Sequence, residues 1–135
     1  GDARAFSQDT NLMIEKNMRQ LVEGICESFG VSADVKYETT CPVTFNQPKQ
    51  AEAATKAAVT LLGEDKCNGD IDPRPFSEDF SIMSENTPGC FLLMGNGTSG
   101  SYGRPLHSAD YDFNDELLVK GSSYWVELAE QQLKI

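Results

Sequence analysis

The sequence predicts an α/β protein with about three strands and three or four helices. Residues 1–40 place an amphipathic helical pattern between two strand-like segments, GDARAF at the start and residues 35–39, which is the order of a β-α-β unit. Residues 90–95, CFLLMG, form an apolar run of strand length between turn residues, as is typical of a strand covered on both faces.

Residues 10–29 are expected to form the first helix, because apolar side chains recur every three or four positions. These side chains are Ile14, Met18, Leu21, Val22, Ile25 and Phe29. Gly30 is expected to end the helix in a left-handed conformation. Val35, Tyr37 and Thr39 then alternate with charged residues, which predicts a strand with one buried face.

Two further helices are predicted before the apolar run. Pro48 suits a first helical position, and the alanine-rich segment that follows ends at Gly63, which predicts a helix with a small-residue face. Ser77 is expected to cap a short helix that ends near Ser84, with acidic residues in its first turn.

A long loop rich in Gly and Ser follows the apolar run and separates it from a last helix. A loop of this length in a compact domain favours a functional role. Asn114 is expected to cap the last helix. The apolar stripe predicted for that helix is Leu118, Gly121, Trp125 and Leu128.

Charge and cysteine content exclude several classes of protein. The chain has 135 residues and a net charge of −10, which disfavours binding to nucleic acid or to anionic membrane surfaces. No segment approaches the roughly 20 apolar residues that a spanning helix needs. The four cysteines are far apart and without a CxxC pair, so we expect reduced thiols in a cytoplasmic protein.

The predicted sheet has too few strands. Sheets usually contain about four to six strands, whereas only about three are predicted here. Gly1 also stands close to the first candidate strand, with no preceding turn or cap. We therefore expect the chain to correspond to part of a longer protein.

His107 is the single histidine and lies in the long loop, where metal ligands and proton carriers are often placed. One histidine cannot form a metal site alone, so a surface histidine is the alternative. The acidic cluster after it could ligate a cation, but solvated loop charge is the favoured account of it. The cluster comprises Asp110, Asp112, Asp115 and Glu116.

Other candidate residues carry weaker signals. Glu78 and Asp79 are adjacent, and consecutive helical residues point in different directions, so favouring a helix N-terminus is their simplest role. The GNGTSG turn could present backbone N–H groups to an anion, but it matches no phosphate-binding motif. Arg4 could grip a carboxylate through its planar guanidinium, with a surface salt bridge as the alternative.

Taken in order, these segments resemble a known family. The order is GDARAF, a helix ending in SFG, VKYETTCPVTFNQP, SEDFSIM, PGCFLLMGNG and LHSADYDFNDELL. It resembles the C-terminal portion of amidohydrolases of the hippurate hydrolase and aminoacylase type, which are dinuclear-metal relatives of carboxypeptidase G and of succinyl-diaminopimelate desuccinylase. SEDFS and HxxxYDFND are the most specific of these motifs.

The resemblance implies a fold and a domain division. Residues 1–44 would be the second half of a ferredoxin-like lid domain, a β-α-β unit that also mediates dimerisation. Residues 45–135 would be the C-terminal part of a zinc-peptidase-like, three-layer α/β catalytic domain. A homodimer through the lid half is expected, and the absent strands would belong to the missing part.

The resemblance also implies roles for particular residues. His107 matches the family's last metal ligand, and Arg4 matches a lid arginine that binds the substrate's carboxylate. Glu78 and Asp79 match a segment that lines the active site. The family has a turn beside its metal site, and this turn corresponds to Gly95, Asn96 and Gly97 here. Small residues in it would let the backbone approach the substrate.

The implied activity is metal-assisted hydrolysis of the amide bond of N-acyl amino acids or small peptides. The cofactor would be a divalent metal such as zinc, manganese, cobalt or nickel, in a site that is incomplete in this chain. The general base and the other ligands would lie outside it, so the isolated chain is expected to be inactive. The alternatives are a non-catalytic binding or dimerisation module, or a subunit that completes a site supplied by another chain.

Overall fold

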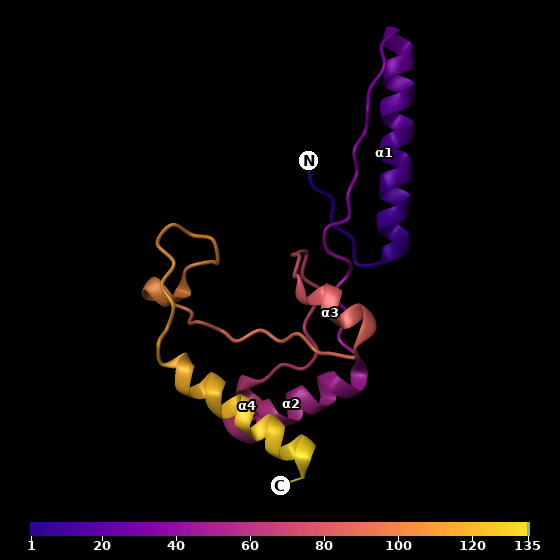
Figure 1. The fold of residues 1–135 in the computed structure, drawn as a ribbon. Helices are drawn as coiled ribbons and strands as arrows, with labels where there is room; N and C mark the ends of the chain where they lie inside the picture. Colours follow the sequence, from indigo (N-terminus) through magenta and orange to yellow (C-terminus); the bar gives the residue numbers. More distant parts are fainter. Residues whose placement is uncertain (135) are drawn as a thin grey trace. The chain divides into compact units, whose positions relative to one another are not determined.

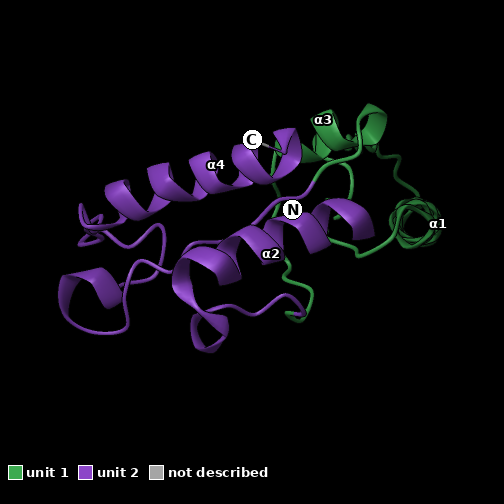
Figure 2. Cartoon of the chain, turned by 90° about the horizontal axis from the view of Figure 1, so that it is seen from below, with its two compact units in different colours: residues 1–46, 71–89 green, residues 47–70, 90–135 purple. Residues whose placement is uncertain are grey.

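The computed structural model describes residues 1–134. Its elements, shown in Figure 1, are α1 (Gln8–Phe29), α2 (Pro48–Leu62), η1 (Glu64–Lys66), α3 (Phe80–Asn86), η2 (Gly100–Gly103) and α4 (Leu117–Leu133). The chain divides into two compact units, coloured in Figure 2: a first unit of residues 1–46 and 71–89, and a second unit of residues 47–70 and 90–135. None of the helices just named has both the length and the apolar character needed to cross a membrane.

Helix α1 of the first unit begins two residues before the predicted start and ends where the sequence predicts. The hydroxyl oxygen of Ser7 accepts the N–H of Thr10 at 3.1 Å, which satisfies one of the free donors of the first turn. At the other end Gly30 has a φ of 64°, and its N–H donates to the carbonyl of Glu27 at 3.1 Å. The predicted glycine cap is confirmed, because glycine adopts this conformation without steric cost.

Residues 35–39 form no strand, and the predicted alternation is seen only in residues 35–38, because Thr39 is exposed. Val35 and Tyr37 are half-buried, whereas the charged residues next to them are exposed. Side chains of α1 bind this segment: Arg19 donates to the carbonyl of Val35 at 2.8 Å. The hydroxyl of Tyr37 donates to Oδ1 of Asn11 at 2.7 Å. Contacts with a helix therefore replace the expected pairing with a strand.

The α/β class predicted from the sequence is not seen, because residues 1–134 contain no β-strand. The three expected strands, at residues 1–6, 35–39 and 90–95, run as irregular chain (Figure 1). A strand needs backbone partners on a neighbouring strand, whereas a helix closes its hydrogen bonds within itself. The described residues offer these segments no such neighbour.

The segment predicted to be the most buried, residues 90–95, is only partly covered. Cys90 and Leu92 are half-buried, while Leu93 is 54% exposed. The apolar composition of this run is the signal of a strand covered on both faces. Here it lacks that cover, so the burial prediction is wrong for this structure.

Helices α2 and α4 pack against each other in the second unit. Pro48 is at the start of α2 and Gly63 follows its end, as predicted. Ala54 and Ala57 are the buried residues of α2, and Tyr124 of α4 is 3% exposed. The hydroxyl of Tyr124 donates to the carbonyl of Ala54 at 3.4 Å. The prediction that small side chains on α2 allow close packing is confirmed.

The packed face of α4 differs from the predicted stripe. Tyr124 is the buried residue, with Gly121 and Leu128 half-buried on either side of it along the helix. Leu118 is 61% exposed and Trp125 is 62% exposed. The predicted stripe is therefore correct for Gly121 and Leu128 and wrong for Leu118 and Trp125, because the apolar positions of this helix occupy more than one face.

The predicted starts of α3 and α4 are each two residues too early. Helix α3 begins at Phe80, with Asp79 rather than Ser77 in the capping position. Helix α4 begins at Leu117, and Glu116 occupies its capping position instead of Asn114. The Oδ1 of Asn114 accepts the N–H of Glu116 at 3.1 Å, so Asn114 forms a local turn before the helix.

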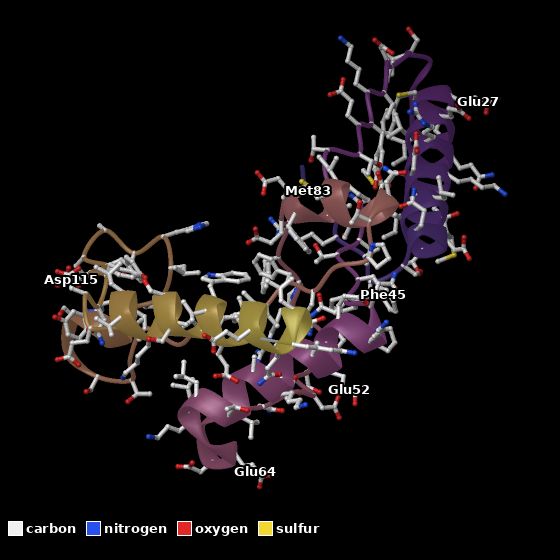
Figure 3. The ribbon with its side chains drawn as sticks, turned by 60° about the horizontal axis from the view of Figure 1, so that its bottom comes forward. Glu27, Phe45, Glu52, Glu64, Met83 and Asp115 are labelled. Carbon is white, nitrogen blue, oxygen red and sulfur yellow. The ribbon has the colours of Figure 1, made fainter. Side chains whose placement is uncertain are left out.

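Few large side chains are buried in the described residues. Along α1, Leu21 is 65% exposed and Phe29 is 79% exposed, so much of its predicted apolar face is uncovered. Met83 of α3, labelled in Figure 3, is 62% exposed. The buried side chains of the described residues are thus confined to the contact between α2 and α4 and to Ser81 near the start of α3.

Candidate functional site

The residues that the sequence singles out are divided between the two units. Arg4, Glu78 and Asp79 belong to the first unit, whereas residues 95–97 and His107 belong to the second. Within the second unit, the glycine-rich turn and the histidine share one loop, which leads from the apolar run into α4 (Figure 1). The association of the first three residues with this loop stays a prediction.

His107 is exposed and has an unusual backbone conformation. Its φ is 68°, a left-handed value that few residues other than glycine adopt and that is more frequent for histidine than for most. The N–H of Ser108 donates to the carbonyl of Pro105 at 3.2 Å and closes a tight turn around it. Within residues 1–134 no hydrogen bond or ion pair engages the imidazole, so its nitrogens are accessible to a ligand.

Asp110 braces the turn that carries His107. One carboxylate oxygen lies 3.0 Å from Nε of Arg104, and the other accepts the hydroxyl of Ser108 at 2.8 Å. The Arg104 and Asp110 side chains are both more than half exposed, so their ion pair contributes little to global stability. Because the loop uses both oxygens of Asp110, this member of the acidic cluster is engaged as a structural brace.

Asn96 lies at the base of the same loop and binds both its middle and its exit. Its side-chain nitrogen donates to the carbonyl of Tyr102 at 3.0 Å and to that of Asp112 at 2.8 Å. Its Oδ1 accepts the backbone N–H of Asn114 at 2.9 Å. The side-chain nitrogen of Asn114 donates back to the carbonyl of Asn96 at 3.2 Å.

The two glycines of the turn have different requirements. Gly97 has a φ of 150°, and a Cβ built on it would lie 2.8 Å from Cβ of Tyr102, so only glycine fits there. A Cβ built on Gly95 would meet nothing within 4 Å. The space in front of Gly95 is open, which is what close approach of another molecule to the backbone requires.

Arg4 binds a neighbouring carboxylate in the first unit. Its Nε and Nη2 both lie 3.0 Å from the same oxygen of Asp2, and its Nη1 donates to the carbonyl of Pro75 at 3.2 Å. The pair is exposed, which matches the surface salt bridge weighed from the sequence. The guanidinium is nevertheless oriented toward a carboxylate, and its role toward a substrate stays a prediction.

Glu78 and Asp79 lie immediately before α3, where their backbone is engaged and their carboxylates are not used as caps. The carbonyl of Glu78 accepts both the N–H of Ser81 at 3.1 Å and its hydroxyl at 2.6 Å. Ser81 is fully buried, and the sequence analysis missed it. Its signal was available, since a serine three residues after Glu78 can bond back to that carbonyl.

The described residues do not assemble a metal site. No group of three or more His, Cys, Asp or Glu side chains suited to a metal ion occurs in residues 1–134. Protein zinc sites use three or four such ligands. His107 has the donor chemistry for a divalent metal, but the part of the chain that is described supplies no partner ligands beside it.

The cysteines are free thiols, as the sequence predicts. All four are half-buried, and none forms a disulfide. Burial raises the pKa of the Cys90 thiol above its usual 9.0. Burial, and secondarily the charge of the Cys90 thiolate, raises the pKa of Tyr124 above its usual 10.0. Both groups are therefore held in their neutral forms at neutral pH.

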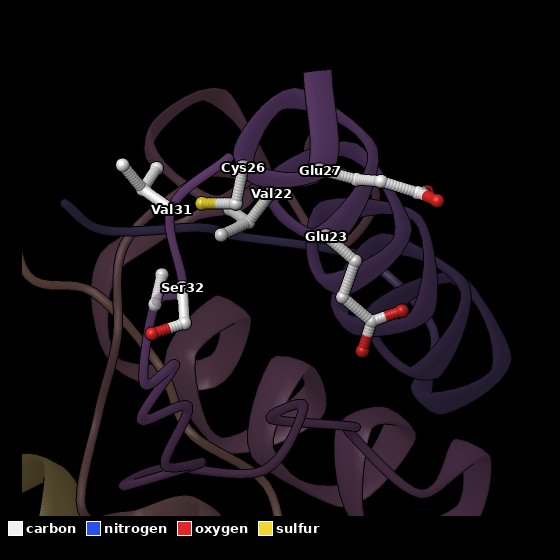
Figure 4. Close-up of a pocket in the computed structure, with 7 residues that line it drawn as sticks. Val22, Glu23, Cys26, Glu27, Val31 and Ser32 are labelled. Atoms are coloured by element: carbon white, nitrogen blue, oxygen red, sulfur yellow. The ribbon is translucent and has the colours of Figure 1, made fainter. Parts of the chain in front are cut away.

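A pocket in the first unit lies at the end of α1 and the start of the segment that follows (Figure 4). Its lining comprises Val22, Glu23, Cys26, Glu27, Val31, Ser32 and Ala33. Val22 and Cys26 project from α1 toward Val31 in the close-up (Figure 4). None of the site residues predicted from the sequence lines this pocket.

Comparison with known proteins identifies relatives over nearly the whole chain. The chain is 29% identical over 131 residues to the hippurate hydrolase of Campylobacter jejuni, covering 97% of this chain and 33% of that protein. It is 31% identical over 130 residues to the N-acetylcysteine deacetylase of Bacillus subtilis, covering 96% and 32%. It is 26% identical over 125 residues to the thermostable carboxypeptidase 2 of Saccharolobus solfataricus, covering 90% and 30%. No solved structure matches the chain.

The chain spans about a third of the length of these curated relatives, in agreement with the expectation that it corresponds to part of a longer protein. The profile of Peptidase family M20/M25/M40 matches residues 4–131, which include the SEDFS motif, the glycine-rich turn and the loop of His107. The chain therefore belongs to Peptidase family M20/M25/M40.

Proposed function

We propose that this chain is part of a metal-dependent amidohydrolase that cleaves the amide bond of N-acyl amino acids or small peptides. The proposal is supported by the family match and by relatives named as a hippurate hydrolase and an N-acetylcysteine deacetylase. The isolated 135-residue chain is proposed to be inactive, since it lacks a complete metal site among its described residues.

The presentation of His107 carries this proposal. A braced loop exposes its imidazole without occupying either nitrogen, and the backbone takes a left-handed conformation there. Such conformations are retained mainly where the surrounding structure enforces them, and they cluster at functional sites. We propose that His107 ligates a divalent cation, such as zinc, manganese, cobalt or nickel, together with ligands from outside this chain.

The remaining site residues are proposed to bind substrate. Arg4 would exchange its exposed Asp2 partner for the substrate's carboxylate, and Glu78 and Asp79 would line the site through carboxylates that cap no helix. The turn at Gly95, Asn96 and Gly97 would contact the substrate through its backbone. The open space in front of Gly95 supports this last role.

The proposal also includes the domain assignment. Residues 1–44 would form the second half of a ferredoxin-like lid that pairs with a second copy, and residues 45–135 would belong to a three-layer α/β catalytic domain. The free cysteines support a reducing, cytoplasmic location. The strands that these domains require would form only when neighbouring strands are supplied.

The test uses the full-length protein encoded by the gene that contains this sequence. The protein is stripped of metal with a chelator, reloaded with each of the four cations, and assayed for release of amino acid from hippurate and N-acetylcysteine. We expect hydrolysis that depends on the metal. The variant His107→Ala should lower kcat/KM by more than about 100-fold, since even residues that only support a metal ligand contribute about 10- to 100-fold.

Leu106→Ala is the matched control, because Leu106 neighbours His107 and is 71% exposed. It should change kcat/KM by no more than about twofold, as expected of a surface substitution. Hydrolysis that survives chelation, or a His107→Ala variant as active as the control, would contradict the proposed function. Metal-dependent hydrolysis by the 135-residue chain alone would contradict its proposed inactivity.

A further inference from the structure

The loop that carries His107 is closed by side chains rather than by regular secondary structure. Apart from the short turn η2, it contains no helix or strand between the apolar run and α4. A loop with few internal contacts samples many conformations unless specific bonds restrict it. The bonds that restrict this loop converge on two asparagines, Asn96 at its base and Asn114 at its exit.

The side-chain amide of Asn96 has no unused donor. Its nitrogen carries two hydrogens, and the carbonyls of Tyr102 and Asp112 accept them at 3.0 Å and 2.8 Å. Its oxygen accepts the N–H of Asn114 at 2.9 Å. Only this orientation of the amide pairs every partner correctly, because two partners are acceptors and one is a donor. A substrate could bind this amide nitrogen only by breaking the loop's own bonds.

Asn114 completes the closure from the other side. Its nitrogen donates to the carbonyl of Asn96 at 3.2 Å, and its oxygen accepts the N–H of Glu116 at 3.1 Å. It therefore links the base of the loop to the residues from which α4 begins. We call the reciprocal pair of Asn96 and Asn114 side chains the asparagine clasp.

The clasp and the ion pair at the tip restrain different parts of the loop. The Arg104 and Asp110 ion pair, at 3.0 Å, joins residues on either side of His107. The clasp joins residues that are 18 positions apart and thereby fixes the position of the turn that carries His107. The tip pair is exposed and weak, so the position of the tip depends mainly on the base.

We infer that Asn96 and Asn114 are positioning residues whose clasp holds the loop in the form that presents His107. This inference rests on the proposed function only in treating His107 as a site residue. In this inference the side chain of Asn96 holds the loop closed, whereas the backbone of the turn remains available to contact the substrate. Neither asparagine is required to touch substrate or metal.

The test uses the isosteric variants Asn96→Asp and Asn114→Asp in the 135-residue chain. Each keeps its Oδ1 acceptor and loses its side-chain donors. Because His107 is the single histidine, its imidazole gives one unambiguous set of nuclear magnetic resonance signals. Hydrogen exchange of backbone amides in residues 97–113 measures opening of the loop.

We expect Asn96→Asp to shift or broaden the imidazole signals and to accelerate loop exchange by roughly five- to hundredfold, as the loss of two hydrogen bonds implies. Asn114→Asp loses a single donated hydrogen bond and should have a smaller effect in the same direction. Far-ultraviolet circular dichroism, which measures helix content, should be unchanged, since neither asparagine of the clasp belongs to a helix.

Asn68→Asp is the matched control. Asn68 is also exposed in a loop of the second unit, and its Oδ1 accepts the N–H of Asp70 at 3.0 Å. The substitution keeps that acceptor and should leave the signals of His107 unchanged. Unchanged signals in Asn96→Asp, equal effects of the Asn68→Asp control, or loss of the far-ultraviolet helix signal together with the loop would each overturn the inference.

The outcome is separable from that of the proposed function. Absence of hydrolysis by the full-length protein would refute the amidohydrolase proposal while the resonance experiment still tested the clasp. Conversely, an active enzyme whose Asn96→Asp variant keeps the wild-type imidazole signals would refute the clasp alone.

Discussion

Tyr124 allows a quantitative test of what holds the second unit together. It is 3% exposed and is the buried residue of α4, opposite the buried alanines of α2. Two substitutions separate its interactions. Tyr124→Phe removes the hydroxyl and keeps the ring, whereas Tyr124→Ala removes both.

The geometry predicts that the ring contributes far more than the hydroxyl. The hydroxyl oxygen lies 3.4 Å from the carbonyl oxygen of Ala54, longer than the roughly 2.5–3.0 Å of a good O–H···O bond. Tyr124→Phe should therefore lower the free energy of unfolding by only about 0.5 kcal/mol, the low end for a hydrogen bond. Tyr124→Ala leaves a cavity and should cost about 3–5 kcal/mol.

The assay is urea unfolding followed by far-ultraviolet circular dichroism, with the free energy of unfolding taken from linear extrapolation. Trp125→Ala is the control. Trp125 is the next residue and a larger ring, with its centroid 5.3 Å from that of Tyr124, but it is 62% exposed. Truncating it should cost less than about 1 kcal/mol, because little of its surface is removed from water.

Two results would refute this reasoning. If Tyr124→Phe were as destabilising as Tyr124→Ala, the hydroxyl rather than the packed ring would hold the two helices together. If Trp125→Ala were as costly as Tyr124→Ala, the side of α4 that bears Trp125 would be covered in solution, contrary to the structure.

The contacts of Arg19 and the raised pKa values of Cys90 and Tyr124 lead to two other predictions. Arg19 donates to Glu15 through Nε and Nη2, at 2.9 Å and 2.7 Å, and to the carbonyl of Val35 through Nη1, at 2.8 Å. Arg19→Lys should therefore speed hydrogen exchange near Val35 several-fold without loss of helix content, because lysine cannot bind both partners at once. Unchanged exchange would contradict this prediction. The pKa values of Cys90 and Tyr124 are raised in the folded state. Above about pH 9 the unfolded state therefore loses these two protons before the folded state does. The stability they contribute is full below that pH and is lost as the pH rises through the folded-state pKa values. Urea midpoints measured from pH 8 to 11 should show this decline, and it should flatten in the double variant Cys90→Ala, Tyr124→Phe; an equal slope in both proteins would count against it.

The helices were predictable where their signals are local. The left-handed Gly30 ends α1, and Pro48 and Gly63 bracket α2, because each acts through the conformation of its own backbone. Asn114 misled the prediction for α4, since its oxygen accepts from Glu116 in a turn before the helix. A capping residue type shows that a turn is near, but its actual partner decides where the helix starts.

The site was predictable in part for the same reason. The length and composition of the loop indicated that His107 is presented at the surface, and the structure places it in a tight exposed turn. The role of Asn96 was not predictable, because its amide partners lie up to 18 residues away. No local pattern reports which distant carbonyls a side chain will reach.

The strand predictions were wrong for a physical reason that also explains why the predicted apolar stripe on α4 is partly wrong. A strand is defined by its neighbours, and residues 90–95 have none among the described residues, so their apolar character finds no sheet to join. Helix α4 forms regardless, and its periodicity fits two faces, one with Tyr124 and one with Trp125. Helix α2 covers the first face, whereas the predicted stripe combined Gly121 and Leu128 of that face with Leu118 and Trp125 of the other. A helix that is apolar on two sides is typical of one covered on both, so periodicity identifies the faces without identifying which neighbour is present.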